Sequence, residues 1–154
     1  MTTLHRNSDN QIIPNFTERQ LFSTSPDAPD THELSTAVII GLSIIRQHFG
    51  LPMRRNSSYR TPIHNAAIGG VSDSQHVLKK AIDADFIDNP DFNIERYSAE
   101  IDSKGTLYAK LRLAGITGIG LYDNFLHIDT RNNKFNSSDE FGQFAFWDNR
   151  KKKI

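Results

Sequence analysis

The chain has 154 residues, which is enough for one ordinary domain with a core of its own. Its 18 basic side chains are balanced by 18 acidic ones, so it lacks the positive charge that indicates binding to nucleic acid or to an anionic membrane. The absence of cysteine excludes disulfides, a thiolate nucleophile and a thiolate metal site.

No signal peptide is expected at the N-terminus and no membrane span along the chain. The N-terminal residues 1–16 contain no apolar segment of the signal-peptide kind. The longest apolar patch, residues 37–45, is interrupted by glycine and serine and is too short to span a bilayer. We therefore expect a soluble monomer made in the cytoplasm, which would need another factor for its release if it acts outside the cell. Residues 1–14 are expected to form a polar arm and residues 150–154 a solvated basic tail.

The first 50 residues predict two helices. Asn15 followed by Glu18 resembles a capping box and predicts a short helix. Apolar residues then recur at steps of three and four, which predicts the main scaffold helix. They are Leu34, Val38, Leu42, Ile45 and Phe49. Asp30 or Thr31 is the candidate cap, and Gly50 is the expected stop.

The second half predicts a sheet with polar side chains on one face. Residues 81–86 alternate between apolar and polar, which predicts a strand with Asp83 and Asp85 on the same face. The other expected elements are strands at 53–59, 116–122, 125–131 and 144–147, helices at 63–68 and 106–113, a turn at 88–92, an ambiguous amphipathic stretch at 93–104 and a polar loop at 134–142. Residues 1–154 are thus expected to form one α+β domain, with helices on one face of a small antiparallel sheet.

Three polar residues stand out because they could share a metal. His76 is followed by a carboxylate seven residues later, Asp83, and by a distant strand histidine, His127. A carboxylate or histidine within an apolar strand is costly to bury unless it is paired or bound to a metal. Two histidines and one carboxylate leave an open position on a tetrahedral zinc, which is typical of a catalytic site. The spacing alone is also compatible with ordinary loop and strand residues.

The sequence around these residues resembles the zinc D-alanyl-D-alanine carboxypeptidase family, which includes phage and bacterial cell-wall endopeptidases and shares its fold with the hedgehog signalling domain. The matching positions of its Ser-x-His and Ala-x-Asp motifs and of its strand histidine are Ser74, His76, Ala81, Asp83 and His127. Its upstream Ser-Gly-Tyr-Arg element is matched by Ser57, Tyr59 and Arg60, with Ser58 in place of glycine. The resemblance covers roughly residues 56–131.

The resemblance implies roles for individual residues. His76, Asp83 and His127 would bind Zn²⁺. Ser74 would support these ligands without contacting the metal itself. Arg60 would contact a substrate carboxylate or a developing negative charge, because a guanidinium can bind either. From the sequence alone, a surface salt bridge is an equally good interpretation of Arg60.

Two positions depart from the family pattern. Lys79 stands where a glycine is usual, which predicts backbone strain if that position has a positive φ angle. Asn124 stands where many members carry the catalytic base, and an amide cannot accept the proton. Asp123 is our preferred base. Asp129 is the other candidate, although we expect it, like Asp85, to support a ligand or Arg60.

The sequence therefore predicts a zinc metallopeptidase that hydrolyses peptidoglycan stem-peptide bonds involving D-amino acids. The reaction could be that of a D-Ala-D-Ala carboxypeptidase or of an L-Ala-D-Glu endopeptidase, in a protein of phage or bacterial origin. The alternative is a module of the same fold that binds metal and cell wall, or serves in a phage particle, without catalysis. Asn124 and Lys79 favour that alternative.

Overall fold

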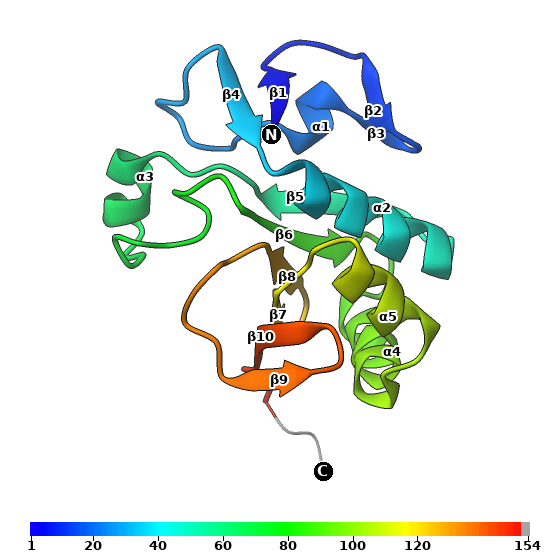
Figure 1. Ribbon diagram of the computed structural model, residues 1–154. Coiled ribbons are helices and arrows are strands. Elements are labelled where there is room, and N and C mark those ends of the chain that lie inside the picture. The colour runs from blue at the N-terminus through cyan, green and yellow to red at the C-terminus, as the bar shows by residue number, and fades with distance from the viewer. Residues whose placement is uncertain (152–154) are drawn as a thin grey trace.

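A six-stranded sheet lies at the centre of the computed structural model, which describes residues 1–151 (Figure 1). Its strand order is β5-β6-β8-β7-β10-β9. The strands are β5 (Met53–Ser57), β6 (Ala81–Phe86), β7 (Gly118–Leu121), β8 (Leu126–Asp129), β9 (Ser137–Asp139) and β10 (Gly142–Asp148). Neighbours are antiparallel except β7 and β10, which run parallel. The sheet is therefore mixed, because the chain that passes through β8 and β9 is long enough to return β10 in the direction of β7.

Three helices cover one face of this sheet, as Figure 1 shows. They are α2 (Thr36–Phe49), α4 (Pro90–Ser103) and α5 (Thr106–Leu113). Helices α2 and α4 both pack on β6, and α5 contacts the two other helices. A Cβ atom at Gly41 would lie 2.9 Å from Cδ1 of Ile116, so this glycine lets α2 approach closely. The predicted α+β class, with its helices on one face of a sheet, is confirmed, but the prediction that the sheet is antiparallel is wrong for the β7–β10 pair.

The core lies between the helices and the sheet. Its members are apolar residues from both layers, among them Val38, Leu42, Ile45, Ile82, Phe86, Tyr97, Leu111, Ile119 and Ile128. Ile82 and Ile128 point toward the helices. Their strand neighbours Asp83 and His127 therefore point to the opposite face, because successive side chains alternate along a strand.

The scaffold helix α2 begins later than predicted. Residues 31–34 form β4 (Thr31–Leu34), in which buried and exposed side chains alternate, and not the first turn of a helix. The cap is therefore Ser35, whose side chain accepts the N–H of Val38 at 3.3 Å. The predicted end at Gly50 is confirmed, since this residue has the left-handed φ of 63° that favours glycine.

The N-terminal residues 1–14 form strands where we expected an arm. Strand β1 (Thr2–His5) pairs with β4, and β2 (Gln11–Ile13) pairs with β3 (Phe16–Thr17). Leu4 is fully buried. A four-residue strand with one buried apolar side chain has no periodicity that sequence inspection can detect.

The short helix α1 (Glu18–Leu21) has a capping box formed by Thr17 and Gln20, two residues later than predicted. Glu18 instead uses its carboxylate to bind the backbone N–H and the ring of His5, which ties the helix to β1. Tertiary contacts thus decided which of two similar patterns became the cap.

Four further segments differ from or complete the predictions. The predicted helix at 63–68 is observed one residue earlier as α3 (Pro62–Ala67), because Pro62 suits the first helical position. The predicted turn at 88–92 overlaps the start of α4, which covers most of the ambiguous stretch at 93–104. The loop at 134–142 contains β9, which pairs with β10. Of the predicted basic tail, residues 152–154 lie outside the described residues, while Arg150 forms ion pairs with Asp148 and Glu95.

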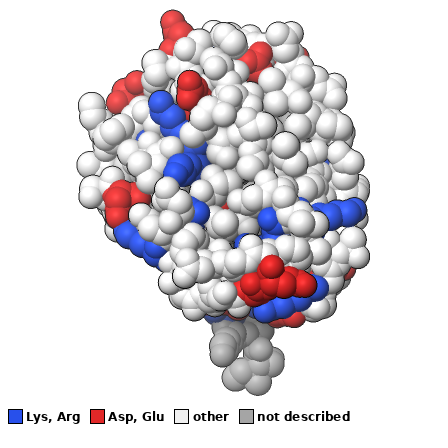
Figure 2. Space-filling view, viewed as in Figure 1, with Lys and Arg blue, Asp and Glu red and all other residues white. Residues whose placement is uncertain are grey.

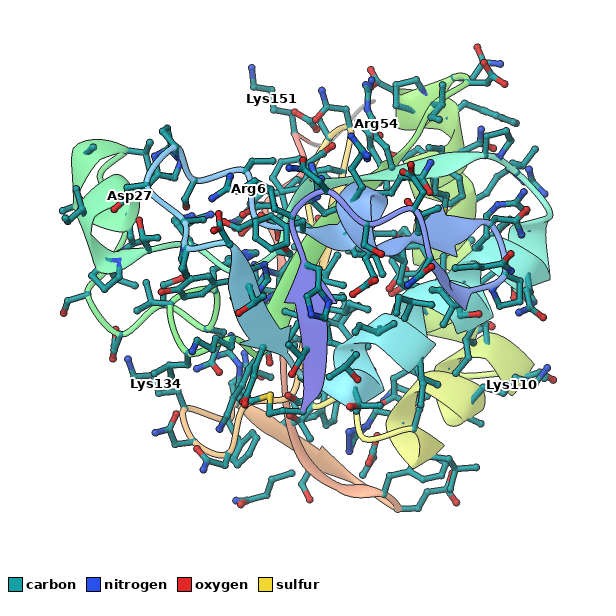
Figure 3. All side chains as sticks on the ribbon, turned by 90° about the horizontal axis from the view of Figure 1, so that it is seen from above. Arg6, Asp27, Arg54, Lys110, Lys134 and Lys151 are labelled. Atoms are coloured by element: carbon teal, nitrogen blue, oxygen red, sulfur yellow. The ribbon has the colours of Figure 1, made fainter. Side chains whose placement is uncertain are left out.

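Charges of both signs are interspersed over the face shown in Figure 2, in keeping with the balanced composition. Side chains such as Lys110, Lys134 and Lys151 lie at the periphery when the molecule is seen from above (Figure 3). None of the helices within residues 1–151 has both the length and the apolar character needed to cross a membrane.

Candidate metal centre

Strands β6 and β8 bring two of the predicted ligands together. They are antiparallel neighbours, and Asp83 lies directly opposite His127 in their register. Because residues opposite each other on adjacent strands project to the same face, the two side chains meet above the sheet. Nδ1 of His127 lies 2.8 Å from Oδ1 of Asp83.

The third residue, His76, comes from the loop that leads into β6. Its backbone N–H donates to Oγ of Ser74 at 3.2 Å, and its carbonyl accepts the N–H groups of Arg60 and Lys79. Lys79 has a φ of 66°, so the position that is glycine in the family pattern does take the left-handed conformation, with lysine strained there. The loop places Nε2 of His76 3.2 Å from Oδ2 of Asp83.

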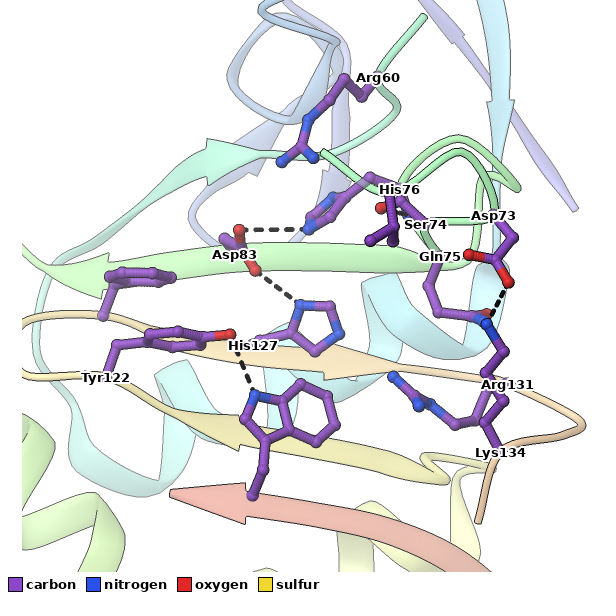
Figure 4. Close-up of a pocket in the computed structure, with 13 residues that line it drawn as sticks. Arg60, Asp73, Ser74, Gln75, His76, Asp83, Tyr122, His127, Arg131 and Lys134 are labelled. Carbon is purple, nitrogen blue, oxygen red and sulfur yellow. Dashed lines mark hydrogen bonds and ion pairs between the residues drawn. The ribbon is translucent and has the colours of Figure 1, made fainter. Parts of the chain in front are cut away.

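His76, Asp83 and His127 therefore converge on one point, as Figure 4 shows. One ligand atom from each residue lies within 4.8 Å of the others. Both histidines are buried, and Asp83 is partly buried. The two ring nitrogens and the carboxylate between them form a donor set that suits zinc.

The other ring nitrogen of each histidine is held by the protein. Nδ1 of His76 donates to the carbonyl of Ser58 at 2.8 Å. Nε2 of His127 lies 2.7 Å from Oδ2 of Asp129, which is fully buried. Metal-binding histidines usually have such an outer hydrogen bond, because it fixes the ring and directs the second nitrogen to the ion. The residues present thus fit a divalent metal.

The three residues lie at the wall of a cavity of about 370 Å³. Its lining also includes Arg60, Val71, Asp73, Ser74, Gln75, Tyr122, Phe125, Arg131, Lys134 and Trp147. Arg60 and Tyr122 lie on opposite sides of the histidine pair, and Asp73 and Lys134 form an exposed ion pair at another edge (Figure 4). The cavity is thus an open site with charged, polar and aromatic groups around the ligand set.

The comparison with protein families shows which family the chain belongs to. The family model described as Peptidase M15 matches residues 15–129, which is most of the chain and spans all three residues of the centre. The chain belongs to the peptidase M15 family. A search of curated proteins found no match. Membership of a peptidase family, together with the His-Asp-His group, indicates a metallopeptidase.

The electrostatics of the site favour the charged forms of Asp83, His127 and Asp129. Burial by itself would raise the pKa of Asp83, but hydrogen bonds from His127 and His76 hold it well below its usual range. Burial would lower the pKa of His127, but Asp129 and Asp83 raise it to about 9. Burial would raise the pKa of Asp129, whereas His127 and Arg131 lower it to about 2. A metal that binds His127 must replace the proton on Nδ1.

The structure places the other predicted site residues in different environments. Arg60 and Ser74 line the cavity, and Ser74 supports the backbone of His76. Asp129 lies behind His127, as expected for a supporting residue. Asp85 is on the same strand as Asp83 but pairs with Arg54, away from the cavity lining.

Asp123, our preferred base, does not line the cavity. It lies in the turn between β7 and β8, where its Oδ1 accepts the backbone N–H of Lys151 at 2.8 Å. Asn124 is exposed in the same turn. The assignment of Asp123 as base remains a prediction that this position does not favour, because a base must reach the reacting water.

Sequence inspection missed three residues that shape the site, which are Arg131, Gly118 and Gly120. Arg131 binds Asp129 through Nη2 at 2.7 Å and lies over the ring of Trp147. A Cβ atom at Gly118 would lie 2.0 Å from Oδ1 of Asp129, and one at Gly120 would lie 2.4 Å from Trp147. Two glycines spaced by two on one strand were the available signal, since that spacing indicates a close approach on one face.

Proposed function

We propose that this protein is a zinc-dependent peptidase that cleaves stem-peptide bonds of bacterial peptidoglycan involving D-amino acids. The observation that carries the proposal is the convergence of His76, Asp83 and His127, with both histidines held by outer hydrogen bonds. Membership of the M15 family supports the reaction class. The resemblance of the site motifs to D-alanyl-D-alanine carboxypeptidases supports the substrate.

The three residues would hold the zinc through two imidazole nitrogens and one carboxylate, which leaves one position open. A zinc ion bound there lowers the pKa of a water ligand and polarises a carbonyl. In the hydrolysis, the oxygen of water bonds to the scissile carbonyl carbon and the C–N bond breaks. The amine leaves with a proton, and the new carboxyl group ionises.

Arg60 is suited to bind the substrate. Its guanidinium donates to Oδ1 of Asn65 at 3.0 Å and to Oγ of Ser57 at 3.4 Å, and both of these partners are neutral. It forms no ion pair with any residue in 1–151, unlike Arg131 and Lys134 in the same lining. We infer that it binds a substrate carboxylate or the carbonyl oxygen as negative charge develops.

A second candidate is a metal-dependent cell-wall binding module without catalysis. The position of Asp123 outside the cavity favours it. Within residues 1–151, the carboxylates that line the cavity are Asp83, which contacts both histidines, and Asp73, which pairs with Lys134. Neither is left unpaired to act as a base. Such a module would bind peptidoglycan through the same cleft and release no product.

Metal analysis with a digestion assay separates these candidates. We expect one zinc per chain in the wild type, and cleavage of purified peptidoglycan peptides that mass spectrometry can follow. Released D-alanine would identify a carboxypeptidase, whereas internal cleavage would identify an endopeptidase. His76→Ala should lose both zinc and cleavage. His48→Ala is the matched control, because this histidine lies on α2 beside Glu100 and outside the cavity.

The outcomes distinguish three cases. Stoichiometric zinc with cleavage supports the peptidase. Stoichiometric zinc with retention on peptidoglycan but no product supports the binding module. A wild type that binds no zinc overturns both proposals.

A further inference from the structure

Trp147 is the only tryptophan in the chain, and it is held against the metal centre. It lies on β10, with its ring centroid 5.1 Å from that of His127 and with the guanidinium of Arg131 4.9 Å from its ring. Its strand partner is Gly120, where a Cβ atom would lie 2.4 Å from the indole. The strand thus leaves room for the indole beside a ligand histidine.

The indole orients a second aromatic residue. Nε1 of Trp147 donates to the phenol oxygen of Tyr122 at 3.0 Å. The Tyr122 ring stacks on Phe125, with centroids 4.2 Å apart and planes 5° from parallel. The backbone N–H of Tyr122 also donates to the carbonyl of Phe125 at 3.1 Å. Ring stacking, backbone and indole together fix where the phenol oxygen lies.

The direction of this hydrogen bond determines what the phenol can do. An indole N–H can only donate, so the oxygen of Tyr122 must accept and its own hydrogen is left to donate elsewhere. Within residues 1–151 no acceptor for that hydrogen is found, and Tyr122 lines the cavity on the side opposite Arg60 (Figure 4). The phenol is therefore a fixed hydrogen-bond donor that faces the site.

We propose that Tyr122 is a catalytic residue that donates a hydrogen bond to the scissile carbonyl oxygen as negative charge develops on it, with Trp147 as its positioning residue. This inference rests on the proposed peptidase function. A donor held in place before the reaction needs no reorganisation, which is why such groups accelerate acyl transfer. Arg60 and Tyr122 would bracket the substrate from the two sides of the ligand set.

The same bond argues against Tyr122 as the proton acceptor, because the phenol oxygen already receives the indole hydrogen. Tyr122→Phe should therefore lower kcat by about 100-fold, the low end for loss of one oxyanion donor, with zinc content unchanged and KM changed less than about twofold. Trp147→Phe should lower kcat less, since the phenol remains. The double variant should be no slower than Tyr122→Phe, because the two residues act as one unit.

Two further measurements do not depend on turnover. The single indole N–H gives one nitrogen-proton resonance, which should move upfield and exchange faster with water in Tyr122→Phe. A phosphinate analogue of the bond that the wild type cuts carries anionic oxygens at the reacting centre. Calorimetry should show that zinc-loaded Tyr122→Phe binds it at least about tenfold more weakly than the wild type.

Tyr97→Phe is the matched control, because Tyr97 is a fully buried phenol in the core and outside the cavity lining. It should change neither the indole resonance, nor turnover, nor phosphinate affinity. The inference is overturned if Tyr122→Phe keeps wild-type turnover and phosphinate affinity. A zinc-loaded wild type that cuts no peptidoglycan peptide overturns the proposed peptidase itself, and the two failures are therefore distinguishable.

Discussion

Two partly buried polar clusters of this protein differ in where their hydrogen-bonding groups point. In the cluster around Asp139, the carboxylate accepts from Arg112 at 3.0 Å, from the hydroxyl of Tyr108 and from the backbone of Phe141. Arg112 also donates to two backbone carbonyls. Each of these donors meets an acceptor that the protein supplies, and the cluster joins α5 to β9 and β10.

In the cluster around Asp83, only the outer groups are arranged in this way. The outer nitrogens of His76 and His127 are bonded to Ser58 and Asp129, while the inner ones share a single carboxylate. The comparison teaches that buried charge alone does not mark a functional site. What marks it is several ligand atoms directed at one point beside a cavity.

The strongest test of this difference is the loss of zinc from Asp83→Asn. The substitution keeps size but removes the charge that two ligands share, so we expect no stoichiometric zinc and no detectable cleavage. Metal analysis and quenching of Trp147 fluorescence by Co²⁺ would measure the loss. Asp85→Asn, on the same strand but paired with the exposed Arg54, should retain zinc. Retention of zinc by Asp83→Asn would remove the basis of the comparison.

Asp139→Asn should act on stability and leave zinc binding intact. Arg112, whose side chain is 2% exposed, would keep its two backbone carbonyls but lose its ionic partner, at a cost of about 3 kcal/mol. For a chain of this length that cost lowers Tm by roughly 10 °C. Equal unfolding curves for wild type and variant at pH 7 would contradict this prediction.

The stability effect of Asp139 should also depend on pH. Burial would raise the pKa of Asp139, but Tyr108, Phe141 and Arg112 lower it below the ordinary value of 3.8. Its contribution is therefore fully present above the unfolded pKa and is lost as the pH falls through the folded pKa. Urea unfolding at pH 7 and at successively lower pH should show the difference between wild type and Asp139→Asn shrinking only below about pH 4.

Asp129→Asn should weaken zinc binding without removing it. Asp129 contacts His127 and is not one of the three converging residues that would hold the zinc, and loss of such a supporting group costs about 10- to 100-fold in affinity. Zinc competition with a chelator would give the affinity. Gly118→Ala sharpens the test, because the added Cβ would press on the Asp129 carboxylate without removing its charge. We expect this variant to lower zinc affinity as well. Unchanged affinity in both variants would show that Asp129 has only a structural role.

Tyr97→Phe should have the smallest effect. The hydroxyl of Tyr97 is fully buried and has no hydrogen-bond partner within the described residues. Its removal should leave the free energy of unfolding equal or raise it by up to about 1 kcal/mol, because a buried unpaired hydroxyl is destabilising. A clear loss of stability in denaturant unfolding would show that this hydroxyl has a polar partner.

Local patterns in the sequence determined much of the framework. Residues 81–86 were predicted as a strand because alternation is a property of neighbouring residues, and β6 has these bounds. The stop of α2 at Gly50 follows equally from one residue's conformational freedom. The spacing of His76, Asp83 and His127 was suggestive only, and the resemblance of the surrounding motifs to a known family singled them out before any geometry was known.

Tertiary structure alone decided how these pieces meet. The register that sets Asp83 opposite His127, the parallel return of β10 that brings Trp147 to the site, and the turn that keeps Asp123 outside the cavity all depend on residues distant in sequence. Strand β1 was missed for the same reason, since its pairing with β4 stabilises it more than its own pattern does. Periodicity reports which face a residue occupies, whereas strand pairing decides which residues share that face.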